Sequence, residues 1–212
     1  MGLMALGLIL FLPAWTLNYW QAWVFLVVFS SSTTTLGVYL ALKDPALLER
    51  RLNAGPAAEQ TTAQKIIASL AIGGLIGVMV FSAFDHRFGW STVPPIVSII
   101  GDVLVAAGLF VDLIALRENS FAGSTVQKFE GQRVISTGLY AHVRHPVYTG
   151  ALIMSIGIPP ALGSLWGLAF LALTIPVLAW RIFNEEALLR NDLPGYAEYL
   201  QKVRFRLVPY LW

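Results

Sequence analysis

The sequence predicts an all-α integral membrane protein, a bundle of about five to six transmembrane helices that ends in a helix hairpin. Hydrophobic residues make up 57% of the 212 residues, and charged residues make up only 12%. The apolar residues also form long runs, as helices that cross a bilayer require. The length predicts one domain over 1–212, with amino-terminal transmembrane helices in 1–118 and the functional hairpin and C-terminal segment in 119–212.

Six apolar segments follow one another along the chain. They cover roughly residues 2–13, 19–42, 64–84, 93–116, 147–158 and 163–180. The second, third, fourth and sixth approach or exceed the ~20 residues that a helix needs to cross ~30 Å of hydrocarbon. The first and fifth are shorter, and each is either a short crossing helix or a partial one packed against protein. Pro159, Pro160 and Gly163 predict a tight turn between the last two segments, which makes them a hairpin.

The basic residues predict the orientation of these helices. If all six segments cross, 13 of the 14 lysines and arginines lie on one side of the membrane, and only Arg87 lies on the other. Short loops that are rich in lysine and arginine stay in the cytoplasm. Both termini and the polar stretches 119–145 and 181–212 are therefore expected at the cytoplasmic mouth of the bundle.

The composition excludes several kinds of site. The chain has no cysteine, which excludes disulfides and thiolate chemistry, and it has three histidines but no His-Glu-x-x-His pattern for a catalytic metal. The net charge of +2 is too small to indicate a nucleic-acid partner. No Gly-x-Gly-x-x-Gly follows a strand pattern, so a Rossmann-type domain is not expected.

The densest group of polar side chains lies in residues 138–150, beside an apolar segment. Ionisable groups are costly next to lipid, so such a cluster indicates a functional site. Pro146 suits the first position of the fifth helix because no N–H is needed there, and His145 would then be the cap. The free N–H groups of this helix end and the charge of Arg144 favour an anion such as a carboxylate. The alternative is structural: Arg144 would only mark the cytoplasmic side of the membrane, and Pro146 would only begin a helix.

Three carboxylates also lie at or near the cytoplasmic boundary. Glu185 and Glu186 follow the last apolar segment, and adjacent carboxylates repel each other unless a cation or hydroxyl groups meet them. A ribose diol or an amino group would suit them, whereas the plain alternative is the solvated end of a helix. Asp112 lies within the fourth segment, about a turn and a half from its cytoplasmic end. Its carboxylate is either hydrogen-bonded in a purely structural role or part of the pocket.

These motifs together resemble a known family. Arg-His-Pro-x-Tyr-x-Gly at 144–150, Glu185–Glu186 and the closing Tyr196-x-x-Tyr199 resemble the isoprenylcysteine carboxyl methyltransferases and the related membrane phospholipid methyltransferases. The resemblance covers 119–212, and the amino-terminal helices match only in hydropathy. It implies a helical membrane enzyme that holds S-adenosylmethionine in a cytoplasmic pocket between the hairpin and the C-terminal segment.

The resemblance also implies the residues of the site. The expected catalytic residues are Arg144 and Glu186. The expected cofactor-binding residues are Tyr140, His145, Pro146, Tyr148, Gly150, Glu185, Glu186 and Tyr199. The expected substrate-binding residues are Arg117, Asn119 and Asp112, partly because bacterial members carry a similar Asn-x-Phe element after the fourth helix. No metal is expected in the site.

The implied activity is methyl transfer to a lipophilic acceptor, with a carboxylate of the isoprenylcysteine type as the first choice. A phospholipid amine and a small thiol are the alternatives. Two interpretations come from other classes: an NADPH-dependent membrane reductase, in which Arg144, Arg204 and Arg206 would bind the 2′-phosphate, and a non-enzymatic membrane protein. The chain is short for a sterol reductase, and the two glutamates would oppose a phosphate-rich cofactor.

The expected partners are a lipophilic or lipidated acceptor and membrane lipid, with neither nucleic acid nor metal. The sequence predicts no oligomeric state. The expected location is a bacterial inner membrane, which the chain crosses several times with its active site facing the cytoplasm.

Overall fold

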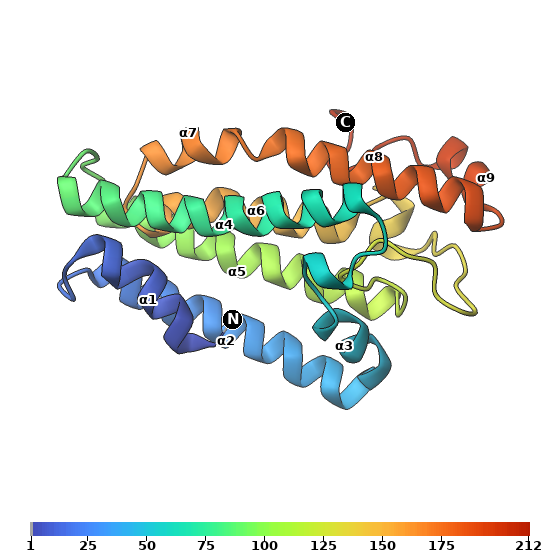
Figure 1. The fold of residues 1–212 in the computed structure, drawn as a ribbon, viewed down its shortest axis with the longest axis horizontal. Helices are drawn as coiled ribbons and strands as arrows, with labels where there is room; N and C mark the ends of the chain where they lie inside the picture. The colour runs from blue at the N-terminus through green and yellow to red at the C-terminus, as the bar shows by residue number, and fades with distance from the viewer. Residues whose placement is uncertain (1) are drawn as a thin grey trace. The chain divides into compact units, whose positions relative to one another are not determined.

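The computed structural model describes residues 2–212, and every regular element among them is helical (Figure 1). The α-helices are α1 (Leu3–Ala14), α2 (Trp20–Lys43), α3 (Pro45–Leu52), α4 (Thr62–Phe88), α5 (Pro95–Glu118), α6 (Pro146–Ala161), α7 (Trp166–Ala172), α8 (Ile175–Asp192) and α9 (Tyr196–Lys202). Two short 3₁₀ helices, η1 (Pro56–Ala58) and η2 (Gly138–Ala141), complete the set. The predicted all-α fold class is confirmed.

Four spans among the described residues are long and apolar enough to cross a membrane. They are α2, α4, α5 and the stretch Trp166–Asp192 that contains α7 and α8. These correspond to the second, third, fourth and sixth apolar segments, so the chain is a membrane protein. Helix α1 has 12 residues and α6 has 16, as the shorter first and fifth segments predicted. Whether these two helices cross stays a prediction.

The prediction for the hairpin turn is wrong in its detail. Pro159 and Pro160 lie inside α6, which continues to Ala161. A membrane helix tolerates proline where neighbouring groups satisfy the carbonyls that the missing N–H leaves free. The turn comes later, at Gly163, whose φ of 70° is a left-handed conformation that glycine adopts without strain. The Ser164 N–H then donates to the Pro159 carbonyl oxygen at 2.9 Å and closes the turn.

The sixth segment also differs from its prediction, because the structure divides it and extends it. Helix α7 ends at Ala172, and α8 begins at Ile175, one residue before Pro176. Proline lacks the N–H that a continuous helix needs, and it restricts the residue before it. Helix α8 then runs to Asp192 rather than ending near residue 180. Glu185 and Glu186 therefore lie within a helix and do not follow one.

The described chain forms two compact units. The first contains 2–35, 72–110 and 151–175, and the second contains 36–71, 111–150 and 176–212. The core of the first unit includes Leu10, Phe25 and Ile158, all fully buried. The second unit has two smaller apolar clusters, one around Leu47 and Leu116 and the other around Tyr196 and Tyr199. All the chemistry predicted from the sequence falls in the second unit.

Within the first unit, α5 and α6 approach each other at two glycines. A Cβ added to Gly101 would collide with the backbone nitrogen of Ala161, and one added to Gly157 would lie 2.6 Å from the Gly101 carbonyl oxygen. Small residues allow this close approach, which stabilises helix pairs in membranes through van der Waals contact. The contact fixes the part of α6 that follows the predicted site.

Gly101→Ala should therefore destabilise the protein by about 1–3 kcal/mol, because the added methyl group has no space and forces the two backbones apart. Thermal unfolding of the detergent-solubilised protein measures the change. Gly73→Ala in α4 is the matched control, since a Cβ at Gly73 meets no atom within 4 Å. Equal melting temperatures for the two variants would contradict the close packing of α5 and α6.

Candidate active site

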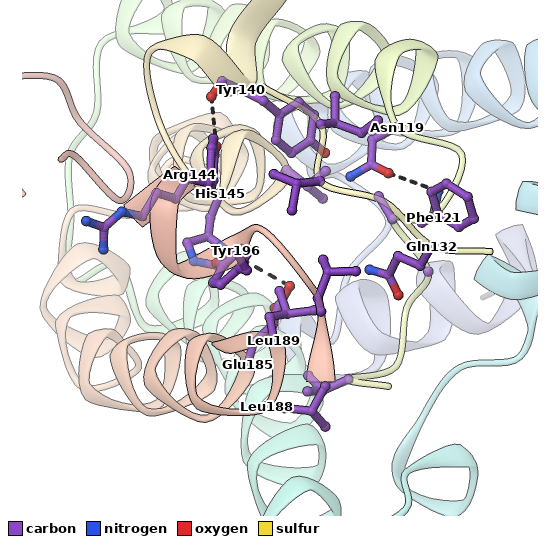
Figure 2. A pocket seen from close by; sticks show the side chains of 18 of the residues that line it. Asn119, Phe121, Gln132, Tyr140, Arg144, His145, Glu185, Leu188, Leu189 and Tyr196 are labelled. Atoms are coloured by element: carbon purple, nitrogen blue, oxygen red, sulfur yellow. Dashed lines mark hydrogen bonds and ion pairs between the residues drawn. The ribbon is translucent and has the colours of Figure 1, made fainter. Parts of the chain in front are cut away.

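A pocket of about 110 Å³ lies in the second unit, surrounded by the motifs that the sequence singled out (Figure 2). One wall is the segment 119–135 after α5, and the opposite walls come from η2, the start of α6, α8 and α9. Eight of the predicted site residues line it: Asn119, Tyr140, Arg144, His145, Pro146, Tyr148, Glu185 and Tyr199. The fold therefore brings together residues that are far apart in the sequence.

Four predicted site residues do not line this pocket. Gly150 is buried in the first turns of α6. Arg117 is exposed, with its guanidinium carbon 5.7 Å from the centre of the Tyr39 ring. Asp112 is buried, and its Oδ1 has no hydrogen-bond partner among residues 2–212. Glu186 is buried in a separate group of charges, described below.

The Asp112 carboxylate lies near one cation, Arg51 of α3. Burial lowers the pKa of Arg51, and the negative charge of Asp112 raises it in partial compensation. The Arg51 guanidinium also donates to the Ala122 carbonyl oxygen at 3.1 Å, which holds the start of the 119–135 wall. Asp112 is therefore linked to this wall only through Arg51, and a direct contact between Asp112 and a substrate stays a prediction.

The segment that carries Tyr140 is fixed by the end of α5. The Leu139 N–H donates to Glu118 Oε2 at 3.1 Å. Gly138 precedes it with a φ of 51°, and a Cβ at this position would collide with the Glu118 carboxylate. Glycine is thus required both for the backbone conformation and for the close approach. The result is a short 3₁₀ turn that buries Tyr140 against the pocket.

The start of α6 matches its sequence-based description. Pro146 is the first helical residue, and the carbonyl oxygen of His145 accepts the Thr149 N–H at 3.0 Å. The backbone N–H groups of Arg144 and His145 donate to the carbonyl oxygens of Phe205 and Arg206 at 2.9 and 3.0 Å. The C-terminal segment therefore pairs with the chain just before α6 and closes this side of the pocket.

Arg144 strengthens the same junction. Its Nε donates to the Val203 carbonyl oxygen at 2.7 Å, and its Nη2 donates to the Leu200 carbonyl oxygen at 2.9 Å. Its Nη1 contacts Glu186 Oε1 at 3.1 Å. Figure 2 shows the guanidinium pointing away from the pocket interior. In this structure Arg144 holds the end of α9 in place, and the pocket meets only part of its side chain.

The two adjacent glutamates of α8 point in different directions. Neighbouring residues of a helix are separated by about 100° around its axis, so they cannot share a face. Glu185 lines the pocket, with about a quarter of its side chain exposed, and its Oε2 accepts the Tyr148 hydroxyl hydrogen at 2.5 Å. Glu186 faces the C-terminal segment. The two glutamates therefore have different surroundings, and His145 lies between them, with its Nδ1 4.0 Å from Glu185 Oε1 and its Nε2 3.4 Å from Glu186 Oε1.

Glu186 is the centre of a buried ion cluster. Its Oε2 accepts from Arg206 Nε at 3.2 Å and Nη2 at 3.1 Å, while its Oε1 contacts Arg144. His145 Nε2 lies 3.4 Å from the same Oε1. Both carboxylate oxygens are thus satisfied by protein groups. Glu186 ties α8 to the start of α6 and to the end of the chain.

Glu185 belongs to a second chain of contacts, which reaches the opposite wall of the pocket. Arg181 Nε donates to the Tyr148 hydroxyl oxygen at 3.2 Å, while that hydroxyl donates to Glu185. Arg181 also donates through Nη1 to Glu59 at 2.5 Å and through Nη2 to the Ser124 carbonyl oxygen at 2.9 Å. Glu59 Oε2 in turn accepts the Val126 N–H at 3.1 Å. One arginine therefore orients a pocket tyrosine and holds the pocket wall.

Sequence reasoning missed several of these residues. Glu59 and Arg181 are 122 positions apart, and nothing in the local pattern of either connects them. Leu188 and Leu189 also line the pocket. They are three and four residues after Glu185, so they share its helical face. A prediction that continued the last helix to residue 192 would have found them.

The remaining pocket surface combines tyrosine rings with aliphatic and amide side chains and one further cation, Arg133. Burial raises the pKa of Tyr140, which a hydrogen bond from Asn119 partly offsets, and burial also raises the pKa of Tyr199. Both phenols therefore stay protonated at neutral pH, and the Tyr199 hydroxyl donates to the Tyr140 carbonyl oxygen at 2.7 Å. Tyr148 and Tyr196 add two further rings. Aromatic faces beside one carboxylate suit a ligand that carries a positive charge.

The described residues contain no group of three or more metal-binding side chains placed to hold an ion. The pocket is smaller than the ~300 Å³ at which small-molecule sites usually begin. A ligand of cofactor size must therefore extend beyond the enclosed part or displace the 119–135 wall.

Residues 96–193 match the family model described as phospholipid methyltransferase. Over this segment the chain is similar to the membrane phospholipid methyltransferases. The segment begins in α5 and ends just after α8, so it includes both the 144–150 motif and the two glutamates. The match confirms the resemblance that the motifs indicated. No curated protein matches the chain.

Glu186→Gln should lower the free energy of unfolding by about 1.5–3 kcal/mol. The change removes a charged acceptor and leaves Arg144 and Arg206 without their counter-ion. Thermal unfolding in detergent measures the loss. Glu185→Gln is the matched control, because an amide oxygen can still accept from the partly exposed Tyr148–Glu185 contact. Equal melting temperatures for the two variants would show that the ion cluster does not hold the fold together.

Proposed function

We propose that the protein transfers a methyl group from S-adenosylmethionine to a lipophilic acceptor. The observation that carries the proposal is the pocket itself: Glu185 and the rings of Tyr140, Tyr148, Tyr196 and Tyr199 surround one space within the second unit. A sulfonium is a cation without N–H donors, and aromatic faces stabilise such a cation. The Glu185 carboxylate suits an amino group or a ribose diol of the same ligand.

S-adenosylmethionine would supply a methyl group that is already activated by its bond to a positive sulfur. The protein then has to hold the acceptor in line with that methyl group, at about 3–3.5 Å. Tyr148 is prepared for such positioning, because Arg181 and Glu185 fix its hydroxyl from two sides. The pocket excludes water on one side through Leu188, Leu189 and Leu193.

A carboxylate of the isoprenylcysteine type is the acceptor that demands least from this pocket. A carboxylate needs no general base, and the one carboxylate that lines the pocket, Glu185, already accepts a hydrogen bond from Tyr148. A phospholipid amine is the second candidate, and the description of the matching family favours it. An ammonium must first lose a proton, and Glu185, which is partly exposed, is the group placed to attract it.

The two ligands would reach the pocket from different phases. A lipophilic acceptor is concentrated in the bilayer and enters laterally, whereas S-adenosylmethionine is dissolved in the cytoplasm. The strong bias of the basic residues supports a cytoplasmic position for the second unit.

The protein should bind S-adenosylhomocysteine, the product form of the methyl donor, with a free energy of about −4 to −8 kcal/mol. Glu185→Gln should weaken binding by about 1.5–3 kcal/mol, because a charge-assisted hydrogen bond is lost. Calorimetry of the detergent-solubilised protein measures both values, with Glu130→Gln, an exposed carboxylate outside the pocket lining, as the control. NADPH is the comparison ligand. Binding of NADPH but not of S-adenosylhomocysteine to folded protein would replace this proposal with the reductase.

A radiolabelled methyl donor should label a membrane-partitioned acceptor. The screen compares prenylcysteine analogues, phosphatidylethanolamine and small thiols, each with wild-type protein and with Glu185→Gln. Label in the prenylcysteine carboxylate is the expected result, and base-labile release of the methyl group identifies the ester. Label only in phosphatidylethanolamine would select the amine alternative. Label found only in a freely soluble, highly polar acceptor would rule out a lipophilic substrate.

A further inference from the structure

We propose that a second, basic depression in the same unit binds the phosphate of an anionic phospholipid headgroup. The depression has a volume of about 480 Å³. Its lining consists of Arg144, Arg190, Ala197, Leu200, Gln201 and Arg206. Apart from Arg144, none of these residues lines the candidate active site. The proposal therefore concerns a separate site and does not depend on the methyl-transfer activity.

The charges in this depression are not balanced. Three guanidinium groups line it, and one carboxylate, that of Glu186, forms ion pairs with two of them. The guanidinium of Arg190, in the last turn of α8, forms no hydrogen bond or ion pair with any residue in 2–212. Its side chain is exposed at the rim of the depression. The site therefore has an excess of positive charge and at least one free guanidinium.

Arg206 is held in a fixed orientation beside Arg190. Its Nε and Nη2 are bonded to Glu186, and its guanidinium carbon lies 5.0 Å from the centre of the Phe183 ring and 5.4 Å from that of Trp212. Its Nη1 forms no ion pair with a carboxylate among residues 2–212, and Gln201 lines the same depression. A planar guanidinium that is already ordered binds phosphate oxygens with little further loss of entropy.

The apolar surroundings favour a lipid as the source of the phosphate. Phe183, which contacts Arg206, is 50% exposed on α8, and Trp180 is 42% exposed one turn earlier. Helix α8 belongs to a span that is apolar enough to cross the membrane. Exposed aromatic residues mark the membrane–water boundary, and basic pockets at that level bind anionic headgroups. Arg206 thus lies where the exposed aromatic side of α8 meets the basic depression.

The test is a titration of the detergent-solubilised full-length protein with phosphatidylglycerol, followed by native mass spectrometry. Wild-type protein should retain phosphatidylglycerol in preference to phosphatidylcholine. Arg190→Gln should weaken retention about fivefold to tenfold, and Arg190→Lys should weaken it less, because lysine keeps the charge but loses the planar fork. Thermal unfolding verifies that both variants are folded.

Arg204→Gln is the matched control, since Arg204 is an exposed arginine of the same C-terminal segment that lies outside the depression. It should retain the lipid as the wild type does. An equal loss in Arg190→Gln and Arg204→Gln would show a diffuse effect of surface charge and would overturn the site. Competition by millimolar inorganic phosphate as effective as that by the lipid would also overturn it, because the ligand would then be a soluble anion.

Discussion

The carboxylate of Glu186 is the contact on which the second unit depends. It joins helix α8 to Arg144, which precedes α6, and to Arg206, near the end of the chain. Each of these arginines then makes further contacts, Arg144 with two backbone carbonyls and Arg206 with two aromatic rings. A single buried charge thereby fixes three segments that are distant in sequence. The pocket lined by Tyr140, Tyr196 and Tyr199 forms between these segments, and the backbone hydrogen bonds of Arg144 and His145 to Phe205 and Arg206 support the same junction.

The fold class was accessible from the sequence because the bilayer imposes a strong and simple constraint. Four apolar runs of sufficient length predicted four spans, and each is present. The predictions that were wrong concern prolines, whose effect on a helix depends on the neighbouring groups. Pro159 and Pro160 were expected to form a turn but remain within α6, whereas the last segment is interrupted just before Pro176, where no break was predicted. Proline breaks a helix only where nothing else satisfies the freed carbonyls.

The site was accessible in outline for a different reason. Arg144 to Tyr148 and Glu185 are dense polar motifs beside apolar helices, and local sequence is sufficient to notice them. The separation of Glu185 from Glu186 requires knowledge that α8 continues past residue 186, because only a helix sends adjacent side chains to different sides. The ion pair of Glu59 and Arg181 joins residues that are far apart in the sequence, and no periodicity or motif predicts such a pair.

The position of Glu59 has a consequence for how the family segment can be used. The matching residues 96–193 contain Arg181 but not its ion-pair partner Glu59. They also end before Tyr196, Tyr199 and Arg206. A fragment cut at the borders of the match would contain Arg181 without its counter-ion and Glu186 without Arg206. Its pocket would lack one anchor of the 119–135 wall and the whole closing segment. The segment that matches the family model is therefore smaller than the unit that builds the pocket, and domain borders for expression should be set by ion pairs rather than by the extent of the match.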